Sequence, residues 1–187
     1  GKPFACHQLA QRAGGDWYLF VDADTVHAPH MLRSVLDAAL KLKVSLLSGF
    51  PRQLAFSLPQ KIAVPMIYFL IMSWAPLWLI HRLKSTRPSV AIGQFLLFPR
   101  DEYWRMGGHK AVQSRILDDI WMGIEVSHHK GRHVAIDLSS VVSCNMYPTV
   151  GSMWTGLVRC VYSVLVMFPA MLLFLVPLAW LLYIGPF

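Results

Sequence analysis

Cysteine is scarce in this sequence of 187 residues, and acidic residues are fewer than basic ones. The three cysteines, Cys6, Cys144 and Cys160, lie far apart, so they suggest neither a disulfide framework nor a Cys-x-x-Cys metal site. Their scarcity fits a reducing compartment, with each thiol packed as a small apolar side chain. Internal repeats and low-complexity tracts are also lacking. The length suits one domain with a hydrophobic core.

The excess of basic residues gives the chain a formal net charge of +7 at pH 7. Nucleic acid is one usual partner of a basic protein, but no basic helix, aromatic platform or zinc-finger spacing supports it here. Basic residues instead follow the uncharged residues 62–80 directly, and Arg159 precedes a second uncharged stretch. This arrangement suits the anionic cytoplasmic leaflet. We therefore predict a membrane partner, with the protein on the cytoplasmic side of the cell membrane, and no nucleic acid.

Charge is absent from residues 161–187, a stretch long enough to cross a bilayer. The apolar residues 62–80 are shorter, rich in tryptophan and interrupted by Pro65 and Pro76. Such a broken segment suits a helix pair in the membrane interface better than a spanning helix. We predict a C-terminal transmembrane helix over residues 161–187 and a membrane-interface segment over residues 54–80. Because the sequence starts without methionine and stops within an apolar region, we expect a fragment of a longer membrane protein.

Apolar periodicity predicts alternating helices and strands, which is the order of an α/β sheet. The strands are expected at residues 17–21, 44–48, 90–98, 133–138 and 141–144. The helices are expected at residues 3–13, from Pro29 to about residue 40, at 100–106, from about 116 to 130, and around Trp154.

Two acids, Asp22 and Asp24, directly follow the apolar residues 17–21. A run of this kind indicates a buried parallel strand, which would place both acids at the carboxyl edge of a sheet, where ligands bind. Two carboxylates this close repel each other and favour a cation, and Mg²⁺ or Mn²⁺ suits their oxygens. The alternative is a pair of solvated acids that cap the next helix.

A second acidic pair, Asp118 and Asp119, stands at the start of a predicted helix. The helix dipole favours acids there, so ordinary capping explains them. A functional interpretation is a general base, because a partly desolvated carboxylate beside another acid can accept a proton near neutral pH.

The order of these motifs resembles family 2 glycosyltransferases with the GT-A fold, above all the membrane-associated branch that includes ceramide, hopanoid and carotenoid glucosyltransferase-like proteins. The resemblance covers nearly the whole chain. The matching residues are Gly1-Lys2-Pro3-Phe4-Ala5-Cys6 through Gln8, Val21-Asp22-Ala23-Asp24-Thr25, Gly93-Gln94-Phe95-Leu96-Leu97-Phe98, Gly107-Gly108-His109 and Ile116-Leu117-Asp118-Asp119-Ile120.

This resemblance implies an α/β, GT-A-like mixed sheet flanked by helices. It implies a partial catalytic domain over residues 1–160 and a truncated transmembrane segment over residues 161–187. The implied reaction moves a hexose with inversion from a nucleotide diphosphate sugar, UDP-glucose foremost, to a membrane lipid or isoprenoid, and the interface segment would hold that lipid.

The resemblance also implies roles for single residues. Asp119 would be the catalytic base. Asp22 and Asp24 would bind Mg²⁺ or Mn²⁺ and the donor diphosphate, with Asp24 the more direct metal ligand. The other implied donor contacts are Lys2 and Arg159, and the implied contacts to sugar or acceptor are Gly93, Gln94, His109 and Asp118.

The sequence departs from the family in two places. The opening strand–helix–strand segment, which carries much of the nucleotide-base site, is absent. The Gln/Arg-x-x-Arg-Trp motif is reduced to Arg159, which could equally anchor the chain at the bilayer surface.

Two other functions fit parts of the pattern. A haloacid dehalogenase-type phosphatase would use Asp22 as a nucleophile that becomes phosphorylated. A non-catalytic membrane fragment would keep the fold without the nucleotide-binding half. Binding of a metal–nucleotide complex would distinguish this fragment from an enzyme.

Overall fold

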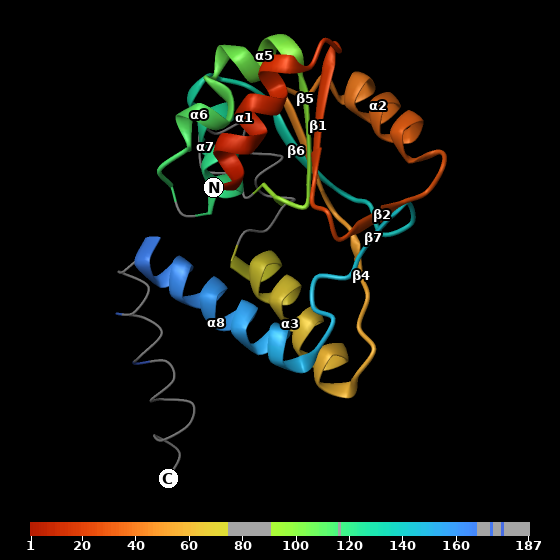
Figure 1. Ribbon diagram of the computed structural model, residues 1–187, viewed down its shortest axis with the longest axis vertical. Helices are drawn as coiled ribbons and strands as arrows, with labels where there is room; N and C mark the ends of the chain where they lie inside the picture. The colour runs from red at the N-terminus through yellow and green to blue at the C-terminus, as the bar shows by residue number, and fades with distance from the viewer. Residues whose placement is uncertain (75–90, 116, 168–172, 174–176, 178–187) are drawn as a thin grey trace. The chain divides into compact units, whose positions relative to one another are not determined.

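The computed structural model describes residues 1–74, 91–115, 117–167, 173 and 177 (Figure 1). The chain divides into two compact units, residues 1–146 and residues 147–187, and each is described by itself.

A four-stranded mixed sheet forms the centre of the first unit. Its strand order is β1 (Trp17–Val21), β5 (Phe95–Pro99), β3 (Leu46–Phe50) and β6 (His133–Asp137). Strand β5 runs antiparallel to both β1 and β3, whereas β3 and β6 are parallel. The carboxyl ends of β1, β3 and β6 therefore lie at one edge of the sheet, together with the beginning of β5.

A smaller three-stranded sheet continues from this edge. Its order is β2 (Thr25–His27), β7 (Val142–Cys144) and β4 (Arg52–Gln53). Each of these short strands follows a strand of the main sheet along the chain: β2 follows β1, β4 follows β3, and β7 follows β6. The small sheet thus fixes the segments that leave the carboxyl edge.

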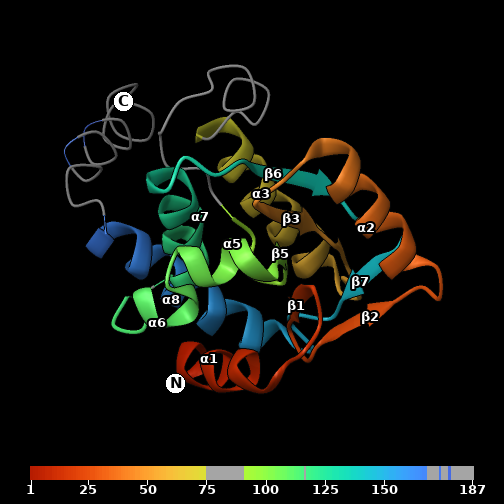
Figure 2. The ribbon, with the colours of Figure 1, turned by 90° about the horizontal axis from the view of Figure 1, so that it is seen from above.

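Helices cover both faces of the main sheet (Figures 1 and 2). One face carries α1 (Lys2–Arg12), α5 (Arg100–Arg105), α6 (Gly108–Ala111) and α7 (Asp118–His128), and the other carries α2 (Met31–Leu42). Helix α3 (Leu58–Trp74) follows β4.

Strand β5 supplies core residues to both layers, because successive side chains of a strand point to opposite faces. Leu96 and Phe98 pack in the cluster that contains Tyr103 of α5. Phe95 and Leu97 pack in the cluster on the α2 face. Burial of four consecutive large apolar side chains explains why β5 lies inside the sheet.

The second unit contains α8 (Val150–Met167), which confirms the helix predicted around Trp154. Among the described residues, no helix combines the length and the apolar character that crossing a bilayer requires. Most of the predicted transmembrane segment after Met167 lies outside the described residues. The predicted domain boundary at residue 160 falls within α8.

The strand prediction for residues 17–21 is right in its bounds but wrong in its pairing. Strand β1 lies at an edge of the sheet and pairs antiparallel with β5. The hydrophobic run could not reveal this, because an apolar run does not specify which strand pairs with it, and only Tyr18 of β1 is fully buried.

Several other predicted boundaries also change. Gly93 and Gln94 lie in a turn before β5 and not inside a strand. Pro29 precedes α2, whose N-cap is His30. The predicted break at Pro65 does not occur, because α3 continues through it to Trp74. The predicted partner helix, with Pro76, lies outside the described residues.

One further strand and one helix face differ from the prediction. The strand expected at residues 44–48 forms at Leu46–Phe50, so it includes Gly49. The buried residues of α7 include Met122 and Val126, whereas Ile120, Trp121 and Ile124 of the predicted face are only half-buried. Ile116 of that face lies outside the described residues.

Candidate functional site

Asp22 and Asp24 lie in the tight turn that joins β1 to β2. The hydroxyl of Thr25 donates a hydrogen bond to the carbonyl oxygen of Asp22 at 2.7 Å, and the amide N–H of Thr25 donates to the same oxygen at 3.2 Å. The amide N–H of Asn145 donates to the carbonyl oxygen of Asp24 at 3.1 Å. Both acids therefore stand at the carboxyl edge, as the sequence predicted. Hydrogen bonds from Thr25 and Asn145 fix the backbone of the turn that carries them.

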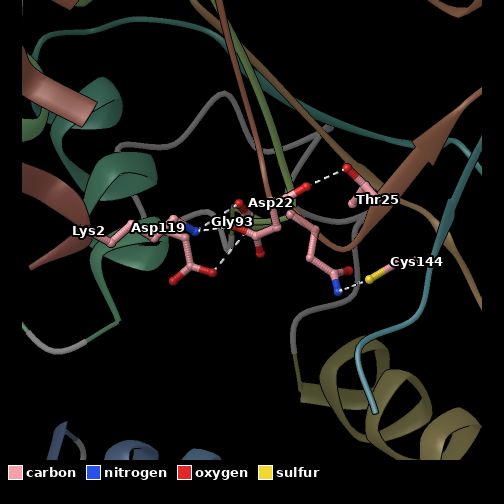
Figure 3. Close-up of polar contacts among 7 residues, drawn as sticks. Lys2, Asp22, Thr25, Gly93, Asp119 and Cys144 are labelled. Atoms are coloured by element: carbon pink, nitrogen blue, oxygen red, sulfur yellow. Dashed lines mark hydrogen bonds and ion pairs between the residues drawn. The ribbon is translucent and has the colours of Figure 1, made fainter. Parts of the chain in front are cut away.

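Lys2, in the first turn of α1, reaches this edge and forms an ion pair with Asp22. Its Nζ lies 2.5 Å from Oδ1 of Asp22 and 3.5 Å from the carbonyl oxygen of Gly93 (Figure 3). Burial lowers the pKa of the Lys2 ammonium, but the hydrogen bond and charge of Asp22, with the charges of Asp118 and Asp119, outweigh burial and raise it overall. Lys2 is therefore a fixed positive charge among three carboxylates.

Asp119, in the first turn of α7, lies close to the turn before β5. The amide N–H of Gly93 donates to its Oδ2 at 3.0 Å, and that of Ile120 donates to its Oδ1 at 2.9 Å (the Gly93 contact is drawn in Figure 3). A Cβ atom on Gly93 would lie only 2.8 Å from Oδ2. Glycine at this position therefore allows the close approach of the carboxylate.

Burial is the main influence on the Asp119 carboxyl and raises its pKa above the ordinary value. The hydrogen bond from Ile120 opposes this shift, the charge of Asp118 adds to it, and the Gly93 bond and Lys2 charge again oppose it. The preceding residue, Leu117, has a left-handed backbone with φ 61°. Such strain concentrates at functional sites, so it agrees with a functional role for this helix start.

A cavity of about 180 Å³ brings several predicted site residues together. Its lining includes Lys2, Gly93, His109, Asp118 and Asp119. Apolar side chains from α1, β1 and β5 line the remaining wall. The cavity therefore combines a half-buried carboxylate, a cation and an apolar wall, and a carboxylate in such surroundings can accept a proton.

His109 lies at this cavity but is only 2% exposed. Its amide N–H donates to the hydroxyl of Tyr103 at 3.1 Å, and its Nδ1 lies 2.9 Å from the same hydroxyl. The Tyr103 hydroxyl accepts the first bond, so it donates its hydrogen to Nδ1. Burial lowers the pKa of His109 to about 4, helped by the charges of Lys2 and His7. The ring is therefore neutral at pH 7, with its proton on Nε2.

Cys144, on the other side of Asp22 from Lys2 in the view of Figure 3, belongs to a polar network. Nε2 of Gln53 donates to Oε1 of Gln94 at 2.8 Å, and Nε2 of Gln94 donates to Sγ of Cys144 at 3.1 Å. Burial raises the pKa of the Cys144 thiol to about 12, and the nearby charge of Asp24 adds to this shift. Sequence reasoning missed Gln53 and Cys144, because neither belongs to a motif and only strand pairing brings them beside the acidic turn.

A larger, mainly apolar cavity of about 530 Å³ lies farther along the carboxyl edge. Phe50 and Gln53 after β3, Val64 and Pro65 of α3, and Asp137 at the end of β6 are among its lining residues. The predicted interface segment, residues 54–80, therefore contributes three residues to this cavity, Ala55, Val64 and Pro65.

The chemistry of the carboxylates at the end of β1 fits a divalent cation. Within the part of the chain that the structure describes, no three histidine, cysteine or acidic side chains come together as a metal site. Asp24 is exposed and Asp22 partly so. Mg²⁺ commonly takes only one or two carboxylates and completes its shell with phosphate oxygens and water. Asp24, and Asp22 once released from Lys2, could hold a cation that arrives with a diphosphate.

Arg159 lies on α8 in the second unit, so its predicted contact with the diphosphate stays a prediction. The other predicted site residues belong to the first unit, and Lys2, Gly93, His109, Asp118 and Asp119 share one cavity. Asp22 joins them through Lys2, whereas Gln94 bonds Cys144, and Asp24 is held by the next residue, Asn145, through a backbone hydrogen bond.

The chain is similar to one protein-family model and to solved structures, but to no curated protein. None of the curated proteins searched matches the chain. Among solved structures, mannosyl-3-phosphoglycerate synthase from Rubrobacter xylanophilus is similar, with a TM-score of 0.45 and 14% sequence identity. The match covers 88% of this chain and 49% of the synthase, so the chain spans about half the length of that protein.

The family model that matches is described as glycosyl transferase family 21, and it covers residues 2–183. The prediction of a glycosyltransferase is thereby confirmed, with family 21 in place of the family 2 that the motifs suggested. Because the match extends over nearly all of the sequence, this chain belongs to glycosyl transferase family 21.

Proposed function

We propose that the protein transfers a hexose, with inversion, from a nucleotide diphosphate sugar to a hydroxyl group of a membrane lipid. UDP-glucose is the proposed donor, and the sheet with its Asp-x-Asp turn at the carboxyl edge is the proposed GT-A arrangement. The observation that carries the proposal is the shielded Asp119 carboxylate, which lines one cavity with Lys2, itself paired to Asp22.

Asp119 is the proposed general base. A raised pKa makes its carboxylate a stronger proton acceptor than an ordinary aspartate. Asp119 takes the proton of the acceptor hydroxyl while the hydroxyl oxygen attacks the anomeric carbon. The bond from that carbon to the diphosphate oxygen breaks, and the electron pair leaves with the nucleoside diphosphate. The hydrogen bonds from Gly93 and Ile120 hold the carboxylate in place during this step.

Asp24 and Asp22 are the proposed residues that hold Mg²⁺ or Mn²⁺ at the diphosphate. A bound cation supplies positive charge to the leaving group. Lys2 serves the same end, since its ammonium can exchange the Asp22 carboxylate for a phosphate oxygen. Arg159 is a proposed further donor contact, and Gly93, Gln94, His109 and Asp118 form the proposed surroundings of sugar and acceptor.

A lipid acceptor is supported by the apolar surfaces near the carboxyl edge. The 530 Å³ cavity has a mainly apolar lining that includes residues of α3. Leu58, Ile62, Met66 and Phe69 are 59–71% exposed on α3, and their spacing places them on one helix face. We propose that this face rests on the cytoplasmic surface of the membrane, where the cavity can receive the lipid head, and that residues 161–187 add an anchor.

The test uses the full-length protein in membranes, with radiolabelled nucleotide sugars, Mn²⁺ or Mg²⁺, and extracted native lipids. Metal-dependent transfer of label from UDP-glucose into the lipid phase is the expected result. Asp24→Ala should weaken metal-dependent UDP binding, whereas Asp37→Ala, an exposed change on α2, should not. Absence of transfer from every nucleotide sugar, with metal-dependent phosphate release from a phosphomonoester, would instead favour the phosphatase.

The phosphatase alternative has less support from the fold. Its pattern requires paired acids after a strand, whereas Asp118 and Asp119 begin α7. Asp22, its proposed nucleophile, is paired with Lys2. The non-catalytic alternative predicts that metal–UDP binding is absent as well as transfer.

A further inference from the structure

His109 lines the same 180 Å³ cavity as Asp119 and is held there by one buried tyrosine. The hydroxyl of Tyr103 accepts a hydrogen bond from the amide N–H of His109 at 3.1 Å and lies 2.9 Å from its Nδ1. Tyr103 is completely buried and is not among the residues that line the cavity. It therefore engages the amide and the Nδ1 of His109 from the core side.

The other ring nitrogen of His109, Nε2, carries a hydrogen for which no described residue is the acceptor. Since Tyr103 donates to Nδ1, the proton of the neutral ring is on Nε2. Among the described residues, the buried side-chain polar atoms that lack a hydrogen-bond partner are Nδ1 of His7 and Oδ1 of Asn145. Nε2 of His109 is not one of these buried atoms, although no hydrogen bond to a described residue engages it. This N–H is therefore accessible from the cavity.

Aromatic neighbours also fix the orientation of the imidazole. The ring of Phe20, which lines the cavity too, has its centroid 4.5 Å from that of His109 with an interplanar angle of 62°. The ring of Tyr103 lies 5.7 Å away, centroid to centroid. An imidazole bonded at Nδ1 and packed against two rings has little freedom to rotate, so the direction of its Nε2–H is set before a ligand binds. A donor fixed in this way favours binding because it need not be ordered first.

The other residues of the cavity indicate which ligand group accepts this hydrogen. Asp119, the proposed base, lines the cavity, and Lys2 connects the cavity to Asp22 at the proposed diphosphate site. The anomeric carbon lies between base and diphosphate in the proposed reaction, so the hexose belongs in this cavity and the lipid head in the 530 Å³ cavity. Hexose hydroxyls are neutral acceptors that suit a neutral N–H donor. A sugar without the hydroxyl would leave the donor buried and unpaired, which disfavours that sugar.

We propose that Nε2–H of His109 donates a hydrogen bond to one hydroxyl of the hexose, and that His109 thereby helps to select the sugar. This inference rests on the proposed function, since it assumes that a nucleotide sugar binds with its hexose in the cavity of Asp119. It deepens that function by naming the donor atom and the class of sugar group that it contacts.

The test measures, by titration calorimetry with Mn²⁺ and without lipid acceptor, how the full-length protein binds UDP, UDP-glucose and the monodeoxy analogues of UDP-glucose. In the unaltered protein, one analogue should bind about 10-fold or more weakly than UDP-glucose, because the buried N–H loses its partner. His109→Asn keeps an amide oxygen for the Tyr103 hydroxyl but has no donor at the Nε2 position. It should bind UDP-glucose about 10-fold more weakly, and that analogue no more weakly than UDP-glucose. Its affinity for UDP, which has no hexose, should stay within about twofold.

His128→Asn is the matched control, because it makes the same change at the exposed end of α7, and it should keep every affinity. The inference is overturned if no analogue binds more weakly to the unaltered protein, or if His109→Asn disfavours that analogue by the same factor. Absence of Mn²⁺-dependent UDP binding to the unaltered protein would instead contradict the proposed function, so the two failures differ. Should His109→Asn not fold, His109→Met removes the same donor at closer volume, and an unchanged penalty for the analogue would again overturn the inference.

Discussion

At the scale of single residues, the surroundings of Asp119 set the pH range in which it can act as a base. Its pKa lies above the ordinary value of 3.8, chiefly because of burial. A base must be unprotonated, so kcat/KM for transfer should fall as the pH drops through this raised pKa. The acid limb of the pH profile should therefore have its midpoint above 3.8. Asp37→Asn should leave the profile unchanged, and an acid limb at or below the ordinary value would contradict the role of Asp119.

Gly93 offers a second test of the same carboxylate. Gly93→Ala places a Cβ atom 2.8 Å from Oδ2 of Asp119, so the carboxylate must move. Since small displacements of reacting groups are costly, kcat should fall by about 10²-fold while UDP binding is kept. Gly14→Ala is the control, because a Cβ there meets no atom within 4 Å. Steady-state kinetics and binding calorimetry check both, and similar kcat values for the two variants would refute the constraint.

The acids of the site are predictable from sequence, but most of their partners are not. Asp22 and Asp24 follow an apolar run, and Asp118 and Asp119 begin a periodic helix, so local pattern places all four. The contact of Asp119 with Gly93 depends on where α7 packs against the turn before β5. The place of Cys144 beside the acidic turn depends on the pairing of β7 with β2. Local periodicity carries no information about either arrangement.

At the scale of elements, α5 and α6 are joined by the buried hydrogen bonds of one tyrosine. Tyr103→Phe removes the partner of both the amide N–H and the Nδ1 of His109. Each of these two buried polar groups left without a partner costs about 1–3 kcal/mol, so the free energy of unfolding should fall by roughly 2–6 kcal/mol. Tyr162→Phe, at an exposed position of α8, should change it little. Urea unfolding checks both, and equal losses would contradict the structural role of Tyr103.

The order of the strands in the main sheet could not be predicted from the sequence. Strand β5 comes late in the chain, yet it lies between β1 and β3. Its insertion makes β1 an antiparallel edge strand, although the apolar run of β1 is equally suitable for a parallel strand. Strands β2 and β4 are also too short for periodicity to detect, since they contain three and two residues. Helices α2 and α7 could be predicted because apolar residues recur at helical spacing in both, although in α7 the buried face is a different one.

At the scale of the whole molecule, the exposed apolar face of α3 predicts contact with a membrane. A fluorophore on Met66→Cys, in a protein whose Cys160 is replaced by serine, should be quenched by lipids that carry quenchers on their acyl chains. The same fluorophore on Leu40→Cys, at an exposed apolar position of α2, should not be quenched. The difference in quenching between the two positions is expected whether or not another segment, such as residues 161–187, also anchors the protein. Equal quenching at the two positions, or none at Met66→Cys, would contradict docking through α3.

The most direct test of the central claim is a comparison of turnover and donor binding in Asp119→Asn. The amide keeps an oxygen for one backbone N–H but cannot accept the proton of the acceptor. In membranes supplied with UDP-glucose, Mn²⁺ and native lipids, transfer should fall by about 10²–10⁴-fold, the usual contribution of a general base. Mn²⁺-dependent UDP binding should remain near that of the unaltered protein. Comparable transfer rates in the two proteins would contradict the assignment of Asp119 as the catalytic base.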